Sequence, residues 1–88
     1  MNALTKLIGL KIKAEREKRK LSPQEFATML GIDRQYLWSI ENGKENMTLN
    51  YLYNMIIILG CPLEDFYDNL INKIIITETE KAENPNQL

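Results

Sequence analysis

The clearest hydrophobic pattern in the chain lies between residues 21 and 43, where apolar residues recur every three or four positions in two short runs. Before the first run, Ser22 is a favourable N-cap, Pro23 follows at the first helical position and Glu25 at the third, which together make a strong helix start. Gly31 stands where a residue in the left-handed conformation is needed to end the helix. The expected buried face of this helix consists of Phe26, Ala27 and Leu30.

The second run predicts another short helix directly after a tight turn. Asp33 can cap its N-terminus, and Asn42 and Gly43 mark its end. The apolar residues expected to face the core are Ile32 in the turn and Leu37 and Ile40 in the helix. Two short helices joined by a turn that contains glycine form a helix-turn-helix unit.

Three further helices are predicted around this unit. The first spans residues 3–20, the fourth begins after Thr48 and ends at Gly60, and the fifth begins near Pro62. The fourth helix is so rich in Tyr and Ile that we expect it to be almost completely buried. The expected inward residues are Leu4, Leu7, Ile8 and Ile12 in the first helix, Leu49, Leu52, Ile56 and Leu59 in the fourth, and Leu63, Phe66, Tyr67 and Leu70 in the fifth.

These elements predict an all-α fold, a compact five-helix bundle that occupies residues 1–72 as a single domain. After it, the run from Ile74 to Thr77 is mostly β-branched and favours a short strand or an irregular arm. Residues 78–88 carry repeated charges and little apolar content, which is typical of a disordered tail. Residues 73–88 are therefore expected to form an arm that contributes to dimerisation and then a disordered end.

Composition narrows the class of protein. Apolar residues make up 44% and charged residues 26% of the 88 residues, as in folded globular domains. The longest apolar run, 55–59, is too short to span a membrane, and the N-terminus lacks a secretory signal pattern, so we expect a cytoplasmic protein. With one cysteine, no histidine and no catalytic motif, the chain favours a binding protein over an enzyme, with no metal or other cofactor.

Charge is distributed unevenly along the chain, although the net charge is only −1. Residues 1–50 carry nine Lys/Arg and six Asp/Glu, a net charge of +3, whereas residues 51–88 carry two and six, a net charge of −4. The basic half therefore contains the helix-turn-helix unit, which is the arrangement expected if that half meets a polyanion.

The chain resembles the large helix-turn-helix family that includes the Cro and phage repressor proteins and the restriction-modification controller proteins. The resemblance runs from about Ile8 to Phe66. It is carried by Arg16, Leu21-Ser22, Glu25-Phe26-Ala27, Gly31-Ile32, Tyr36-Leu37, Ile40 to Gly43, Thr48-Leu49 and Leu59-Gly60. It implies that the second helix lies across the backbone of double-stranded DNA and that the third helix enters the major groove.

The third helix must then present polar groups on its outward face. Arg34 can contact guanine and Gln35 can contact adenine, each in bidentate fashion, and these are the principal expected base readers. Tyr36, Trp38 and Ser39 are further candidates. For Trp38, packing against the first or fourth helix is weighed equally with contact in the groove. The residues expected to contact phosphates are Gln24, Asn42, Lys44, Asn46 and Thr48.

The resemblance also implies an internal ion pair between Arg16 and Glu41, which would link the first helix to the end of the third. Two positions depart from the family pattern. Pro23 stands where many relatives carry a glutamine that contacts DNA, and Glu15 stands where relatives often place an apolar residue. Pro23 therefore weakens the DNA contact expected from the second helix.

Since a single domain of this size buries little interface and relatives act as two-fold dimers, we expect a homodimer on a pseudo-palindromic operator. The residues expected at the dimer interface are Leu63, Phe66, Tyr67, Leu70, Ile71 and Ile74. The alternative is that these residues only close the core of the monomer.

The leading interpretation is a small sequence-specific transcriptional regulator. A controller protein, a phage-type repressor and an antitoxin that represses its own operon share this pattern, and the sequence identifies neither a toxin nor a polymerase contact. The alternative from another class is a protein-interaction module that has kept the fold and lost DNA binding, which the net charge and Pro23 favour.

Overall fold

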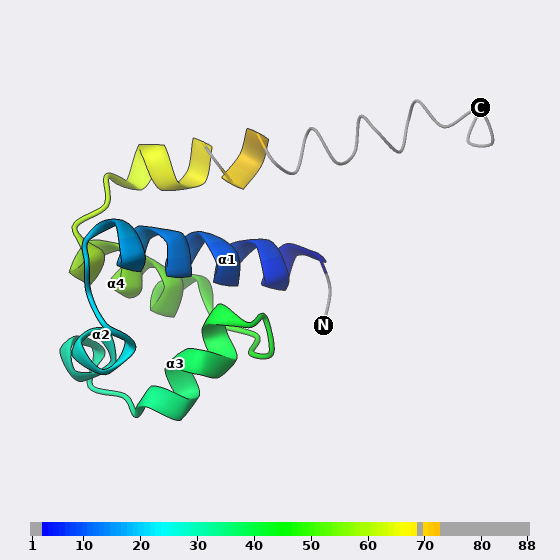
Figure 1. Ribbon diagram of the computed structural model, residues 1–88. Coiled ribbons are helices and arrows are strands. Elements are labelled where there is room, and N and C mark those ends of the chain that lie inside the picture. The colour runs from blue at the N-terminus through cyan, green and yellow to red at the C-terminus, as the bar shows by residue number, and fades with distance from the viewer. Residues whose placement is uncertain (1–2, 69, 73–88) are drawn as a thin grey trace, which may run out of the picture.

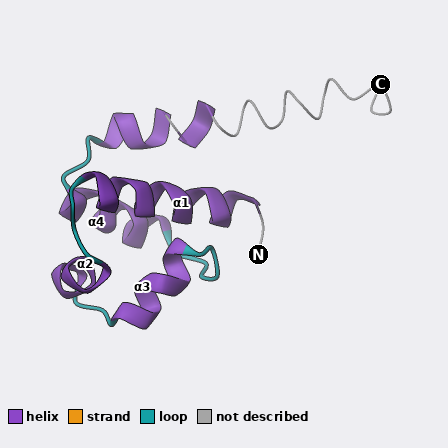
Figure 2. Ribbon diagram, viewed as in Figure 1, coloured by secondary structure: helices purple, strands orange, loops and turns teal. Residues whose placement is uncertain are grey.

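The computed structural model describes residues 3–68 and 70–72, and every regular element within these ranges is a helix. In chain order the helices are α1 (Ala3–Lys18), α2 (Pro23–Leu30), α3 (Arg34–Glu41) and α4 (Leu49–Leu59), followed by a last helical segment over 63–68 and 70–72 (Figure 1 and Figure 2). The predicted all-α fold with five helical segments is confirmed. The arm and tail predicted over residues 73–88, Ile74 included, lie outside the described residues.

Short-range capping chemistry sets the start of the three inner helices. In the capping box of α2, the Glu25 amide donates to Ser22 Oγ at 3.0 Å and the Ser22 amide donates to Glu25 Oε1 at 2.9 Å. The side chains of Asp33 and Thr48 accept the equivalent amide hydrogen bonds at the starts of α3 and α4. Gly31 follows α2 with φ 72°, the left-handed conformation that was expected there.

The helices enclose one hydrophobic core to which all five segments contribute. α3 packs against both α1 and α2, and α4 contacts the same two helices from another side. The largest fully buried side chains are Phe26, Phe66, Ile12, Leu37, Ile40, Met55 and Ile56. This packing fixes α3 while leaving its opposite face in solvent. No helix within the described residues is long and apolar enough to cross a membrane.

Three expectations about the helices were wrong. Leu4, which was expected to face inward from the first helix, is 46% exposed. α1 ends at Lys18, because Lys20 adopts a left-handed conformation with φ 58° and the chain turns there. α4 is not almost completely buried: Leu49, which was expected to face inward, is 78% exposed, and Tyr53 and Ile57 are also exposed. Since almost every position of α4 is apolar, its pattern does not distinguish the packed face from the free one.

The structure also corrects part of the predicted dimer interface. Phe66 and Leu70 lie in the core of the same chain, where a partner chain cannot reach them. Leu63 and Ile71 are exposed, and Tyr67 packs edge-on against Phe66 at the margin of the core. Two of the predicted interface residues therefore close the monomer, and the apolar surface open to a partner includes α4.

Glu15, the acidic residue at an otherwise apolar position, is buried between one cation on α1 and another just after its end. Its carboxylate binds Lys11 Nζ at 3.0 Å and Arg19 Nη1 at 2.7 Å. Although burial opposes the charged form, the hydrogen bonds from Arg19 and Lys11 lower the pKa of Glu15 to about 2. The Glu15 carboxylate thus pairs with two cations of the basic half, Lys11 and Arg19, and these are no longer available to an anionic partner.

Candidate nucleic-acid interface

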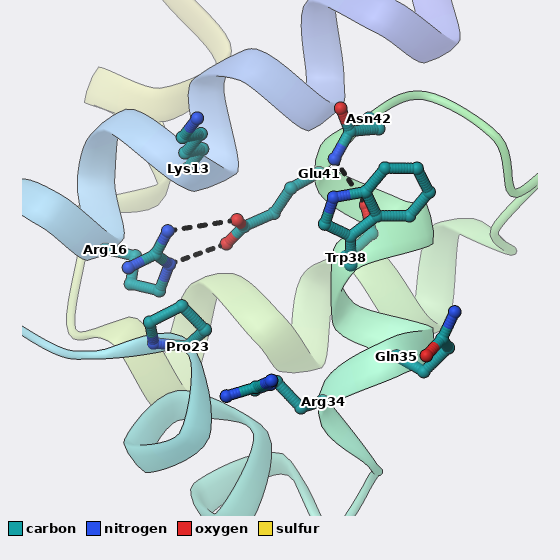
Figure 3. A pocket seen from close by; sticks show the side chains of 8 residues that line it. All are labelled: Lys13, Arg16, Pro23, Arg34, Gln35, Trp38, Glu41 and Asn42. Carbon is teal, nitrogen blue, oxygen red and sulfur yellow. Dashed lines mark hydrogen bonds and ion pairs between the residues drawn. The ribbon is translucent and has the colours of Figure 1, made fainter.

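A hollow of about 570 Å³ lies where α1, the N-terminus of α2 and the outward face of α3 meet (Figure 3). It adjoins the two short helices that the family resemblance assigns to the DNA backbone and the major groove. The residues that line it are Lys13, Arg16, Pro23, Arg34, Gln35, Trp38, Glu41 and Asn42.

A buried ion pair closes one side of the hollow. Arg16 donates from Nε to Glu41 Oε2 at 2.7 Å and from Nη2 to Glu41 Oε1 at 3.1 Å, and its Nη1 donates to the Leu21 carbonyl at 2.8 Å. The hydrogen bonds to Glu41 raise the pKa of Arg16. The pair implied by the family resemblance is therefore present. It ties α1 to the end of α3. The positive charge of Arg16 is balanced by Glu41 within the protein.

Arg34 and Gln35, the principal predicted base readers, stand in the first turn of α3 with exposed side chains. Both line the hollow, but they point in different directions. Figure 3 shows Arg34 reaching towards Pro23 and Gln35 directed to the other side of the helix. The two side chains can therefore meet separate positions along a duplex.

The other three predicted base readers have different surroundings. Trp38 lines the hollow and is 51% exposed, which favours contact in the groove over packing against the first or fourth helix, the two alternatives weighed equally for it. Tyr36 is half-buried and its ring stacks on Tyr51, with 6.4 Å between ring centroids. Ser39 is also half-buried. Neither Tyr36 nor Ser39 lines the hollow.

Of the predicted phosphate contacts, Asn42 lies at the hollow and its side-chain amide donates to the Trp38 carbonyl at 2.8 Å. Lys44 does not line the hollow, but its Nζ lies 5.7 Å from the centroid of the Trp38 ring. The others are placed outside the hollow: Gln24 donates to Thr28 Oγ1 at 3.2 Å, Thr48 caps α4, and Asn46 is exposed in the loop before α4. These positions leave Asn42 and Lys44 grouped around the end of α3.

Lys13 was not among the predicted site residues, yet it lines the hollow from α1 with an exposed side chain (Figure 3). It lies three residues before Arg16, a spacing that puts both on one face of a helix. That spacing, combined with the position implied for Arg16, was the signal that could have found it. Among the described residues, neither Lys13 nor Arg34 has a carboxylate within 4.0 Å, so both cations remain open to an anion.

The sequence of this chain is similar to that of known helix-turn-helix proteins. A family model described as helix-turn-helix matches residues 12–66. The control protein C.MunI from Mycoplasma sp. is 38% identical over 71 residues, which cover 80% of this chain and 96% of that protein.

Solved structures share the fold. The wild-type restriction-modification controller protein C.Esp1396I superposes with a TM-score of 0.77 at 24% identity, covering 85% of this chain and 99% of that one. The same controller has been solved as a tetramer in complex with its natural 35 base-pair operator. The clp gene regulator ClgR from C. glutamicum gives a TM-score of 0.73 at 18% identity, covering 81% of this chain and 91% of that one.

Proposed function

Because the chain belongs to the helix-turn-helix family of Cro and phage repressor type, we propose that it is a small transcriptional regulator that binds a specific sequence of double-stranded DNA. The observation that carries the proposal is the outward face of α3, where Arg34 and Gln35 stand beside a hollow bordered by Lys13. The relative C.MunI, which this chain matches over 96% of its length, is a control protein. This favours the role of a restriction-modification controller over that of a phage repressor or an antitoxin.

The geometry is suited to a duplex. A major groove about 12 Å wide admits one helix, and the exposed first turn of α3 carries the two side chains best able to make bidentate contacts with base edges. A backbone strand that follows the hollow would bring a phosphate near Lys13 on α1. Asn42 and Lys44, at the other end of α3, are placed for a second phosphate.

The base-reading and phosphate roles can be separated by two substitutions, tested on the duplex that the full-length protein enriches from a random pool. Arg34→Ala is expected to weaken binding to this duplex by about 1 to 3 kcal/mol per half-site and to relax the preference at one base pair. Lys13→Ala is expected to weaken binding to all duplexes alike and to lower the salt-dependence slope by about one per subunit. Fluorescence anisotropy at several salt concentrations measures both effects.

The matched control is Lys18→Ala, which removes an exposed lysine of the same helix that does not line the hollow. It is expected to change affinity and salt slope less than Lys13→Ala does. Equal effects of the two lysines would argue against a phosphate at the hollow. An unaltered base preference in Arg34→Ala would remove Arg34 as a reader.

We also propose that the protein acts as a homodimer through the free face of α4. Leu49, Tyr53 and Ile57 follow one another at four-residue spacing, so they form one exposed apolar stripe along the helix. A single recognition helix covers only a short stretch of groove, and a two-fold dimer places two of them about one DNA turn, roughly 34 Å, apart.

Ile57→Glu is expected to shift the protein from dimer to monomer, because it places a charge within the apolar stripe. Light scattering at tens of micromolar gives the mass. Leu10→Glu is the matched control, since Leu10 is exposed to a similar extent but lies on α1. A monomeric wild-type protein, or a dimer that persists in Ile57→Glu, would contradict the proposed interface.

The second candidate function is a protein-interaction module without DNA binding. It is favoured by Pro23, which lines the hollow at the first position of α2 and has no amide hydrogen to donate to a phosphate. Failure to enrich any duplex from the random pool, with no effect of Arg34→Ala on weak general DNA binding, would support this function instead.

A further inference from the structure

Trp38 is the large apolar side chain that α3 leaves in solvent. Its neighbours Leu37 and Ile40 are fully buried, whereas the indole is 51% exposed. It follows Arg34 and Gln35 by about one helical turn and lines the hollow together with them. The face that carries the polar base readers therefore also offers an apolar ring.

The surroundings of Trp38 fix the backbone next to the ring and place a cation over it. Lys44 Nζ lies 5.7 Å from the ring centroid, a cation–π contact. The Asn42 side chain donates to the Trp38 carbonyl, and the Lys44 amide donates to the Ser39 carbonyl at 2.8 Å, so the turn that carries Lys44 is bonded to the end of α3. The indole is thus an exposed apolar surface with a cation beside it, and the turn that carries this cation is fixed.

This combination selects for a particular ligand chemistry. An apolar surface with Lys44 beside it, and with Lys13 and Arg34 lining the same hollow, fits a small apolar group that is itself flanked by anions. In the major groove thymine alone presents a methyl group among the four bases, and phosphates run along both sides. Resting on the proposed function, we infer that the Trp38 indole reads a thymine by contact with its C5 methyl group while Lys44 binds a neighbouring phosphate.

The test removes the methyl group without changing any hydrogen-bonding group. In the duplex enriched by the full-length protein, each thymine is replaced in turn by deoxyuridine, and the Kd is measured for the wild type, Trp38→Ala and Trp38→Phe. At one thymine of each half-site the replacement is expected to weaken wild-type binding about fourfold, as for the loss of one buried methyl group. Trp38→Ala should bind more weakly and be insensitive to that replacement, and Trp38→Phe should retain part of the sensitivity.

Two controls separate the contact from indirect effects. Arg34→Ala should keep the sensitivity at that thymine, because its own contact is with another base. Circular dichroism checks that each variant is folded. Because the Trp38 side chain is half exposed, we expect Trp38→Ala to remain folded. Because the chain has a single tryptophan, its fluorescence reports directly on this side chain, and its emission should change on binding the enriched duplex.

The outcomes distinguish this inference from the function on which it rests. If the wild type binds the enriched duplex but no deoxyuridine weakens it, or Trp38→Ala is as sensitive as the wild type, the thymine contact is refuted and the proposed function stands. If a single strand of the same sequence binds as tightly as the duplex, the indole stacks on bases instead. If no duplex is enriched, both fail.

Discussion

Arg16→Ala is expected to lower the free energy of unfolding by about 3 to 5 kcal/mol, because it leaves the Glu41 carboxylate buried without its partner. Both side chains of the pair are only 6% exposed, so water cannot replace the lost hydrogen bonds. For a domain of this size the melting temperature should fall by at least about 12 °C. Urea unfolding and thermal melts followed by circular dichroism measure the change.

Two comparison variants show whether the stranded charge is the cause. Lys18→Ala, an exposed position in the same helix, should change stability by less than about 0.5 kcal/mol. Replacing both partners with apolar residues, Arg16→Met with Glu41→Leu, should recover a large part of the loss, because no buried charge then remains. A single Arg16→Ala variant as stable as Lys18→Ala would show that the pair contributes little.

The starts of α2, α3 and α4 could be predicted because the residues that cause them lie within a few positions of each other. Ser22 and Glu25 bond across three positions, as do Asp33 and Thr48 with the amides that they cap. Such chemistry can be read directly from the chain. The orientation of α4 could not be read in this way, because it depends on which of its apolar faces meets α1 and α2.

The burial of Phe66 and Leu70 illustrates the same limit. The sequence showed an apolar face on the last helix, but periodicity alone does not tell whether such a face meets its own core or another chain. The structure places both residues inside the monomer and leaves Leu63 exposed. Only the three-dimensional packing settles this kind of choice.

For the candidate site, the first turn of α3 was predictable because an N-cap at Asp33 fixes where Arg34 and Gln35 begin. Lys13 was missed because it joins the hollow from α1, and the approach of two separate helices is a long-range result. The setting of Trp38 depends likewise on the turn that places Lys44 over its ring.

Gly9 is the clearest case in which sequence and structure point in opposite directions. By propensity alone, alanine in place of a glycine inside a helix should stabilise α1 by about 1 kcal/mol. In the fold, however, a Cβ atom at Gly9 would lie 2.5 Å from the Ile40 carbonyl oxygen and 2.7 Å from that of Glu41. These are backbone atoms, which cannot move aside as a flexible side chain can. Together with Arg16, Gly9 therefore fixes the end of α3 against α1.

Gly9→Ala is accordingly expected to destabilise the protein by about 1 to 3 kcal/mol, since the clash outweighs the gain in helix propensity. Gly60→Ala provides the contrast, because open space surrounds that position and only its left-handed backbone, φ 75°, is strained. In Gly9→Ala the end of α3 must shift, so binding to the enriched duplex should weaken as well, whereas Gly60→Ala should bind like the wild type. Urea unfolding and fluorescence anisotropy measure the two effects. A Gly9→Ala variant more stable than the wild type would mean that α1 and α3 can move apart at that point without a loss of stability. The close contact between the two helices would then not be what positions α3.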